Sequence, residues 1–257
     1  MNRILQASYQ MQSKWRFSTA TPILLLLIGV AGPVSAQDEP SRVQAGAGLV
    51  VGVPSGEFGN YVTNPGGGIT GHLGYRIPNT LAIIGVNVGY IIYGRETRRE
   101  PFSLTAPDVK VRVITENNIL PVNLFLRFQP REGRLRPYVE GLTGFHYLFT
   151  ETTIEDIPTS TENGFIASST NFGDFSFTYG GSVGVMLQVF DGNEKRRTQG
   201  GAVKSVSLDF RFRYLNGGNA SYLERGAITR SAGQVTLNTT RSRTNIATIY
   251  IGGAVEF

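Results

Sequence analysis

Alternation between apolar and other side chains over residues 248–257 constrains the fold more than any other feature of this sequence. One set of alternate positions is apolar: Ile249, Ile251, Val255 and Phe257. The other set comprises Thr248, Tyr250, Ala254 and Glu256. Because successive side chains of a strand point to opposite faces, the segment predicts a β-strand with one apolar face. An exposed apolar edge strand invites aggregation, and closure of the sheet into a barrel removes the edge.

The first 36 residues have the composition of a secretory signal peptide. They contain three basic residues and no acidic one, and an apolar run occupies 23–31. This run is shorter than the roughly 20 residues that cross a bilayer, and Val34-Ser35-Ala36 fits a cleavage site. We therefore expect cleavage before Gln37, with either Met1 or Met11 as the first residue.

Residues 37–257 are predicted to form one β-barrel domain. Loss of the leader removes three of the basic residues behind the formal charge of +5, so the mature chain carries a charge of about +2. This balance gives no indication of nucleic-acid binding. The chain has no cysteine, which excludes disulfides and thiolate metal sites. We expect no cofactor and no bound metal.

Eight segments of the mature chain alternate in this way, each near the length of a tilted transmembrane strand. They are 43–53, 67–76, 81–93, 118–129, 136–149, 174–190, 204–215 and 245–257. One face of each is apolar, and the other is rich in glycine, serine and asparagine with a few charges. The second face suits a narrow, crowded lumen, so the apolar face is expected to contact lipid.

Connections between these segments alternate between long and short. The short ones are 77–80, 130–135 and 191–203, and the long ones are 54–66, 94–117, 150–173 and 216–244. Outer-membrane barrels have short periplasmic turns and long extracellular loops. The sequence therefore predicts an all-β protein, an eight-stranded antiparallel up-and-down transmembrane β-barrel.

One hairpin carries a family resemblance. The segment Leu120-Pro121-Val122, followed by Arg136-Pro137-Tyr138, resembles the central hairpin of the OmpA-transmembrane-domain and OmpX-like outer-membrane barrels. The resemblance implies a monomer in the outer membrane, in contact with its lipid and lipopolysaccharide. It also implies that the barrel-assembly machinery binds the C-terminal strand, with Tyr250 and Phe257 as the assembly signal. A fold alone does not determine function.

Charged residues on the inward face predict an ion network in the lumen, because charges in a low-dielectric interior must pair or stay hydrated. The candidates are Arg127, Glu140, Asp209, Arg211 and Arg213. A hairpin turn at Glu132-Gly133 places Arg127 diagonal to Glu140. Such a network is either a gate in a narrow pore or a structural plug, and the plug is favoured.

His72 and His146 are the only histidines, and both are predicted to point inward. Lipid-A-modifying barrels use a histidine with a serine and an acid near the outer rim, so His146, Ser176 and Glu151 are the candidates for such a set. No spacing in the sequence requires a triad, and we predict no catalytic residues. Two histidines alone are too few ligands for a metal site.

The predicted loops differ in charge. The 150–173 loop carries acidic residues only: Glu151, Glu155, Asp156 and Glu162. The last loop carries an excess of arginine: Arg225, Arg230, Arg241 and Arg243 against Glu224. The basic loop is suited to lipopolysaccharide phosphates, and the alternative is an ordinary solvated surface.

These features predict a non-enzymatic protein of the outer membrane with an envelope-structural or surface-interaction role. A narrow porin-like channel is the first alternative, since the inward face mixes small residues with charges. A lipid-A-modifying enzyme is the second. A soluble barrel that binds an apolar ligand inside is the third, and it would require the two faces to be exchanged.

Overall fold

The computed structural model describes residues 42–103, 106–156, 165–192, 203–231 and 234–257. These residues belong to the compact unit Pro40–Phe257. The signal peptide predicted at 1–36 lies outside the described residues, so it stays a prediction.

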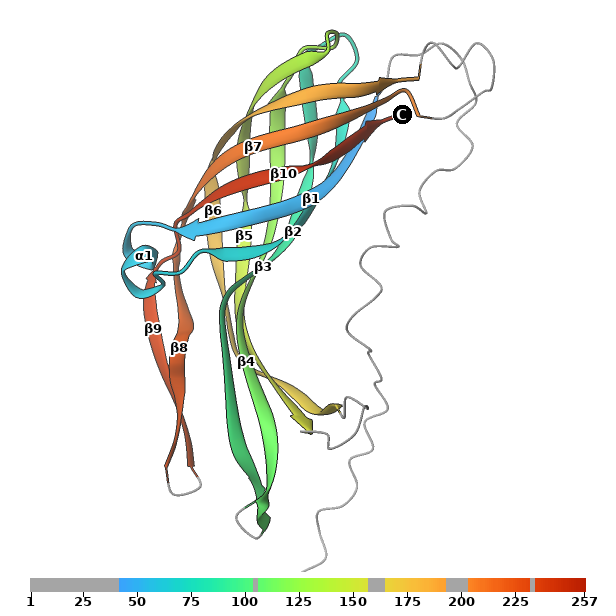
Figure 1. Cartoon of the computed structure of the whole chain (residues 1–257). Helices are drawn as coiled ribbons and strands as arrows, with labels where there is room; N and C mark the ends of the chain where they lie inside the picture. The colour runs from blue at the N-terminus through green and yellow to red at the C-terminus, as the bar shows by residue number, and fades with distance from the viewer. Residues whose placement is uncertain (1–41, 104–105, 157–164, 193–202, 232–233) are drawn as a thin grey trace, which may run out of the picture. The chain divides into compact units, whose positions relative to one another are not determined.

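Eight antiparallel strands form a closed barrel (Figure 1). They are β1 (Val43–Pro54), β2 (Gly66–Arg76), β3 (Ala82–Ser103), β4 (Ala106–Phe128), β5 (Leu135–Asp156), β6 (Phe165–Asp191), β7 (Ser205–Gly217) and β10 (Ile246–Glu256). Around the barrel the order is β1–β10–β7–β6–β5–β4–β3–β2, and β2 pairs with β1 to close the ring. The predicted eight-stranded antiparallel barrel is confirmed.

The terminal strand β10 closes the barrel because it has a partner on each side. It pairs with β7 and with β1, where Gln44 lies opposite Glu256 and Leu49 lies opposite Ile251. The pairing continues to the last residue, whose backbone N–H donates to the carbonyl of Val43 at 2.9 Å. The apolar strand that opened the sequence analysis therefore leaves no free edge.

The two faces of the strands have the predicted orientation. On β4, Leu124 and Phe128 point outward and are 62% and 51% exposed, whereas the intervening Asn123 and Arg127 are buried. Large apolar side chains are exposed in the same alternation on every strand of the barrel. Such a surface is unsuited to water and suits the hydrocarbon of a membrane.

Inward glycines make room for the larger lumenal side chains. A Cβ added to Gly46 would lie 2.4 Å from the ring of His72, and one added to Gly184 would lie 2.4 Å from the ring of Tyr138. The small residues on this face are therefore a consequence of a crowded lumen, as the sequence predicted.

We call the two ends of the barrel the turn end and the loop end. The turn end carries the connections 77–81 and 129–134 together with the C-terminus, and the loop end carries α1 and the far ends of β3 to β6 (Figure 1). At the loop end, a short helix α1 (Glu57–Tyr61) lies between β1 and β2. Among the described residues, no helix has the length and apolar composition needed to cross a membrane.

Two predicted loops are largely strands in the structure. The barrel strands continue through most of the segments 94–117 and 150–173, so the prediction of loops there was wrong. β3 and β4 stay paired as far as Ser103 and Ala106, and β5 and β6 as far as Glu155 and Phe165. Cross-strand partners explain the extension, since Arg95 lies opposite Glu116, and opposite charges across a strand pair are stabilising.

The predicted loop 216–244 also contains two strands, β8 (Asn219–Ser231) and β9 (Gln234–Arg243). They pair only with each other and form a separate hairpin at the loop end (Figure 1). β8 packs against the extended parts of β3, β4, β5 and β6. The loop end is therefore a structured β-rich surface.

Replacement of Leu124 by arginine tests the orientation of the outer face. We expect Leu124→Arg to lower the free energy of unfolding by about 2–4 kcal/mol, because it places a charge near the middle of the bilayer. The measurement is urea unfolding of the refolded protein in lipid vesicles. Thr97→Arg, at an exposed position of the β3 extension, is the matched control and should be neutral. Equal stability of both variants would contradict the assignment of the lipid-facing side.

Candidate functional site

The five predicted charged residues come together in the lumen, and we call them the lumenal network: Arg127, Glu140, Asp209, Arg211 and Arg213. Arg127 on β4 pairs with Glu140 on β5 at 2.6 Å, and both side chains are fully buried. Arg213 and Arg211 on β7 lie 3.6 and 3.8 Å from the other carboxylate oxygen. One carboxylate thus connects three strands.

Asp209 forms the second half of the network. It pairs with Arg211 at 2.6 Å and accepts a hydrogen bond of 2.5 Å from the Tyr138 hydroxyl, which in turn accepts one of 2.9 Å from Arg211 Nε. The guanidinium of Arg127 lies 4.2 Å from the ring centre of Tyr138, and that of Arg211 lies 4.7 Å from the ring centre of Tyr250. Aromatic faces thus supply part of the stabilisation that water would give these cations.

A separate cluster surrounds Glu256 at the turn end. Arg136 donates to both carboxylate oxygens at 2.9 and 2.8 Å, Ser205 donates at 2.8 Å, and Gln44 donates at 2.9 Å. Arg76 lies 3.8 Å away. The second-last residue of the chain is therefore bonded to β1, β5 and β7, which fixes the end of β10 in the barrel.

Arginine exceeds carboxylate inside the lumen. The buried charged residues described are five arginines (Arg76, Arg127, Arg136, Arg211, Arg213) and three acids (Glu140, Asp209, Glu256). Removing one partner of a buried pair typically costs about 3–5 kcal/mol, because the other charge stays buried. The acids are in the minority, and both Glu140 and Glu256 lie within 4 Å of more than one arginine.

The predicted diagonal relation of Arg127 and Glu140 was wrong, because the two residues lie directly opposite each other in the β4–β5 register. The hairpin is centred between Gly133 and Arg134, one residue later than expected, and Gly133 has a φ of 104°. Moving the centre by one residue shifts the pairing by two, which preserves the face of each side chain. The inward position was thus correct and the register was not.

An apolar cluster closes the lumen at the loop end, and we call it the apolar plug: Val50, Ile91, Ile119, Leu148, Leu215 and Ile246, with Phe58, Tyr93 and Tyr222 above them. Phe58 belongs to α1 and is completely buried. Its ring contacts Tyr222 of β8 and Tyr93 of β3 edge to face, with ring centres 5.0 and 5.6 Å apart. The connection after β1 thus folds over the barrel mouth.

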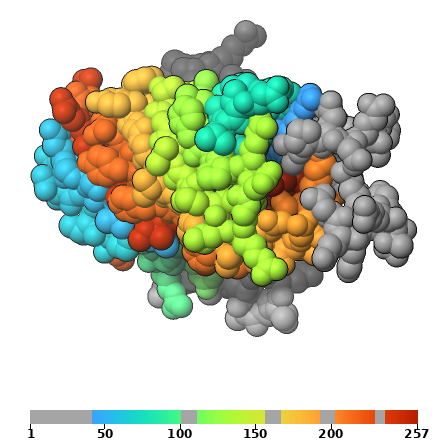
Figure 2. Space-filling model, turned by 90° about the horizontal axis from the view of Figure 1, so that it is seen from above, coloured from blue at the N-terminus to red at the C-terminus, as the bar shows by residue number. Residues whose placement is uncertain are grey.

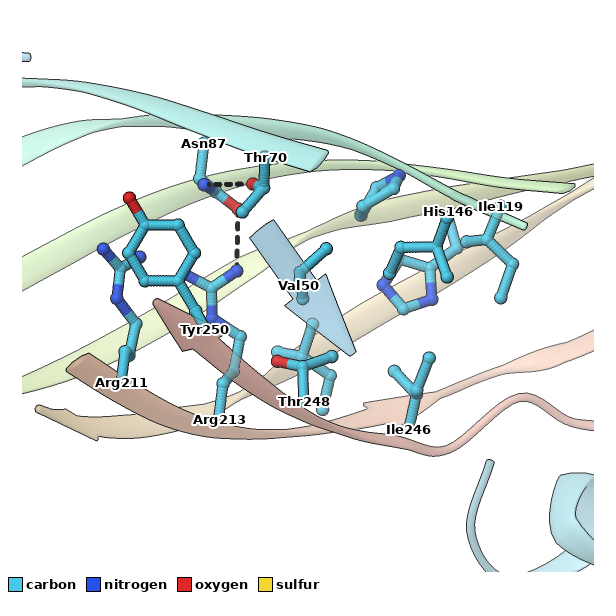
Figure 3. A pocket seen from close by; sticks show the side chains of 13 residues that line it. Val50, Thr70, Asn87, Ile119, His146, Arg211, Arg213, Ile246, Thr248 and Tyr250 are labelled. Atoms are coloured by element: carbon cyan, nitrogen blue, oxygen red, sulfur yellow. Dashed lines mark hydrogen bonds between the residues drawn. The ribbon is translucent and has the colours of Figure 1, made fainter. Parts of the chain in front are cut away.

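The space left between the lumenal network and the apolar plug is small. Figure 3 shows Arg211, Arg213 and Tyr250 on one side of it and His146, Ile119 and Ile246 on the other.

The remaining cavity measures about 20 Å³, which is enough for about one water molecule. The described side chains therefore leave little free space between the lumenal network and the apolar plug. Figure 2 shows one outer face of the molecule, where side chains of β4 and β5 (yellow-green) cover the middle of the view.

The candidate catalytic residues His146, Ser176 and Glu151 do not assemble into a triad. His146 and Ser176 are both buried and lie opposite each other on β5 and β6. The Ser176 hydroxyl donates to the Gly218 carbonyl at 3.0 Å, and His146 Nδ1 has no hydrogen-bond partner in the described part of the chain. Glu151 instead accepts a hydrogen bond from Ser168. The nucleophile–base–acid relay that such chemistry requires is not formed.

His72 also lies inward, with its Nδ1 atom 3.4 Å from Arg211. In the described residues no group of three or more histidine and carboxylate side chains is arranged to hold a metal ion.

The charged residues of the predicted loops lie on strands. Glu155 pairs with Arg112 across β4 and β5 at 3.5 Å. Arg241 and Arg243 lie on β9, and Arg225 lies on β8, all three exposed. The side chains of Asp156, Glu162 and Arg230 lie outside the described residues.

Comparison with known proteins agrees with this architecture. A family model for the outer membrane protein beta-barrel domain matches residues 23–221. The chain belongs to this family. The family points to the outer membrane as the location of the barrel.

A search of curated proteins gives no match. Among solved structures, the crystal structure of Neisserial surface protein A is similar, with 14% sequence identity and a TM-score of 0.38. The alignment covers 85% of this chain and 98% of that one.

Several lumenal residues were missed by sequence reasoning. Gln44, Arg76, Arg136 and Tyr138 all point inward and contact the charged groups described above. Each occupies an inward position of the alternation, so the periodicity was the available signal. Their partners come from strands far apart in the sequence, which periodicity does not indicate.

A double-mutant cycle tests the central pair. We expect Arg127→Ala and Glu140→Ala each to be destabilising and the double variant to cost about 1–3 kcal/mol less than their sum, because each single change leaves a buried charge unpaired. The measurement is the free energy of unfolding in detergent micelles. Arg112 and Glu155, whose side chains are 41% and 36% exposed, form the control pair and should couple weakly. Additive effects at the central pair would show that the two charges do not depend on each other.

Proposed function

We propose that this protein is a non-enzymatic outer-membrane barrel whose filled lumen supports a structured extracellular surface. The observation that carries this proposal is the lumen itself, which is occupied by paired charges at its centre and by the apolar plug at the loop end. The cavity between the two measures about 20 Å³, which supports a lumen closed to solutes. The role is then envelope-structural or surface-interacting, and the loop end performs it.

The shape of the loop end supports a surface-interaction role. Strands β3 to β6 extend beyond the ring formed with their neighbours, and the β8–β9 hairpin packs against them. Binding residues are commonly placed on such segments above a rigid scaffold.

The outer surface of the barrel and its predicted signal peptide indicate how it reaches the membrane and what it contacts there. We propose export by the signal peptide at 1–36 and insertion by the barrel-assembly machinery, which would bind strand β10. The exposed arginines Arg225, Arg241 and Arg243 are suited to lipopolysaccharide phosphates. Closure of the ring leaves no unpaired edge among its eight strands, which supports a monomer.

Conductance tests the closed lumen. We expect the refolded mature protein to give no steady, salt-dependent openings in a planar bilayer, because both the network and the plug obstruct the lumen. Folding is checked first by the heat-dependent shift on a gel, and a large porin in the same bilayer serves as the positive control. Regular openings would contradict the proposal and favour a narrow channel.

Deletion of Phe257 tests the assembly signal. We expect the truncated chain to reach the outer membrane at a strongly reduced level, because the machinery would lose the terminal aromatic residue of β10. The measurement is the amount of heat-modifiable protein in outer-membrane fractions. Phe257→Tyr keeps an aromatic ring and should assemble normally. Unchanged levels of the truncated protein would show that the terminal residue is dispensable.

A further inference from the structure

A second pocket lies at the loop end, beside the apolar plug, and measures about 390 Å³. Its walls come from α1 and the segment 62–65 that follows it, from β3 at 92–95, from Asn117 of β4 and from Arg225 of β8. Ligand pockets typically measure roughly 300–1,000 Å³. This pocket is therefore large enough for a small molecule, whereas the lumenal cavity is not.

A β-bulge shapes one wall of the pocket. β3 and β4 pair Ile92 with Asn118 and Gly94 with Asn117, so Tyr93 is the extra residue between them. Bulges turn a side chain in a new direction and occur often beside functional sites. Tyr93 is 5% exposed, and its hydroxyl has no hydrogen-bond partner among the described residues. An unsatisfied buried hydroxyl is unfavourable, and a ligand that supplies an acceptor would remove this cost.

Two arginines give the pocket a positive charge. Arg95 is paired with Glu116 at 3.3 Å, so its charge is largely balanced. Arg225 is exposed and forms no ion pair within the described part of the chain. Its neighbour Glu224 accepts a hydrogen bond from Thr240. Among the described residues that line the pocket, Arg225 is therefore the cation without an ion pair, and it is suited to a carboxylate.

Neutral groups occupy the rest of the wall. Asn64 is exposed, and Asn117 accepts from Thr150 through its oxygen at 2.7 Å, which leaves its amide NH₂ as a donor. Tyr61 is half exposed and lies near Pro65, so it offers a flat apolar surface. Amides pair with hydroxyl groups, and an aromatic face accommodates the C–H face of a sugar ring.

We propose that this pocket binds an acidic saccharide, a sugar ring that carries a carboxylate. A simple anion would use Arg225 and leave the amides and Tyr61 without a role, and a neutral sugar would leave Arg225 unpaired. This proposal rests on the proposed surface-interaction role and specifies its ligand class. The sugar belongs either to a soluble glycan or to the sugar chain of a membrane lipid, which have the same chemistry.

Calorimetric titration of the refolded protein in micelles tests the pocket. We expect glucuronate to bind about tenfold more tightly than glucose, which has a similar ring without the carboxylate. Arg225→Ala should weaken glucuronate binding by about tenfold, and Tyr93→Phe, which keeps the ring, should weaken it by a smaller factor. Arg241→Ala removes an equal charge from β9, outside the pocket, and should leave binding unchanged.

Three results would overturn the proposal: equal binding of glucose and glucuronate, equal competition by inorganic phosphate, or glucuronate binding that Arg225→Ala does not weaken. If the barrel neither conducts in bilayers nor binds glucuronate, the pocket proposal is also overturned, and the proposal of a closed scaffold stands. If the protein binds glucuronate as expected but conducts steadily, the closed scaffold is overturned and the pocket proposal stands.

Competition identifies the source of the sugar. Displacement of glucuronate by soluble uronic-acid oligosaccharides supports a glycan ligand, and displacement by vesicles that contain lipopolysaccharide supports a membrane lipid. Both results require Arg225, so each supports the pocket.

Discussion

The carboxylate of Glu140 is the interaction on which the interior of this barrel depends. It neutralises Arg127 at 2.6 Å and lies within 4 Å of Arg211 and Arg213, so that three cations share one anion with the help of Asp209. Buried guanidinium groups are stable only when such partners are in place. Because the partners come from β4, β5 and β7, the pairing of charges and the alignment of the strands depend on each other. Glu256 has the same function at the turn end, where it joins β10 to β1 and β5.

The side chains that fill the lumen limit which surfaces of the barrel can contact other molecules. The charged groups in the middle of the barrel are paired with one another, and the loop end is closed by apolar side chains that include Phe58 of α1. A barrel of eight strands has an interior just wide enough for side chains. What remains available for interaction is the outer surface and the loop end, where four strands continue and a separate hairpin packs against them.

Periodicity predicted the strands, their two faces and the inward position of the five charged residues, because these properties depend only on the alternation of neighbours. It did not predict the register of β4 and β5, since Gly133 moves the centre of the turn by one residue. It failed for the extended strands because their polar residues resemble a loop until pairs such as Arg112 and Glu155 are brought together. The apolar plug was missed for a similar reason, since Phe58 reaches it only when the chain after β1 folds back.

The bulge at Tyr93 connects the closed lumen to the pocket outside it. The ring of Tyr93 packs against Phe58 within the plug, and the same residue lines the wall of the pocket. Packing against the plug holds this wall in place before any ligand arrives, which lowers the entropic cost of binding. Interactions that fill the barrel would therefore also make its loop end a better binding surface. A strand without the bulge would keep regular pairing and would lose the residue that the plug and the pocket share.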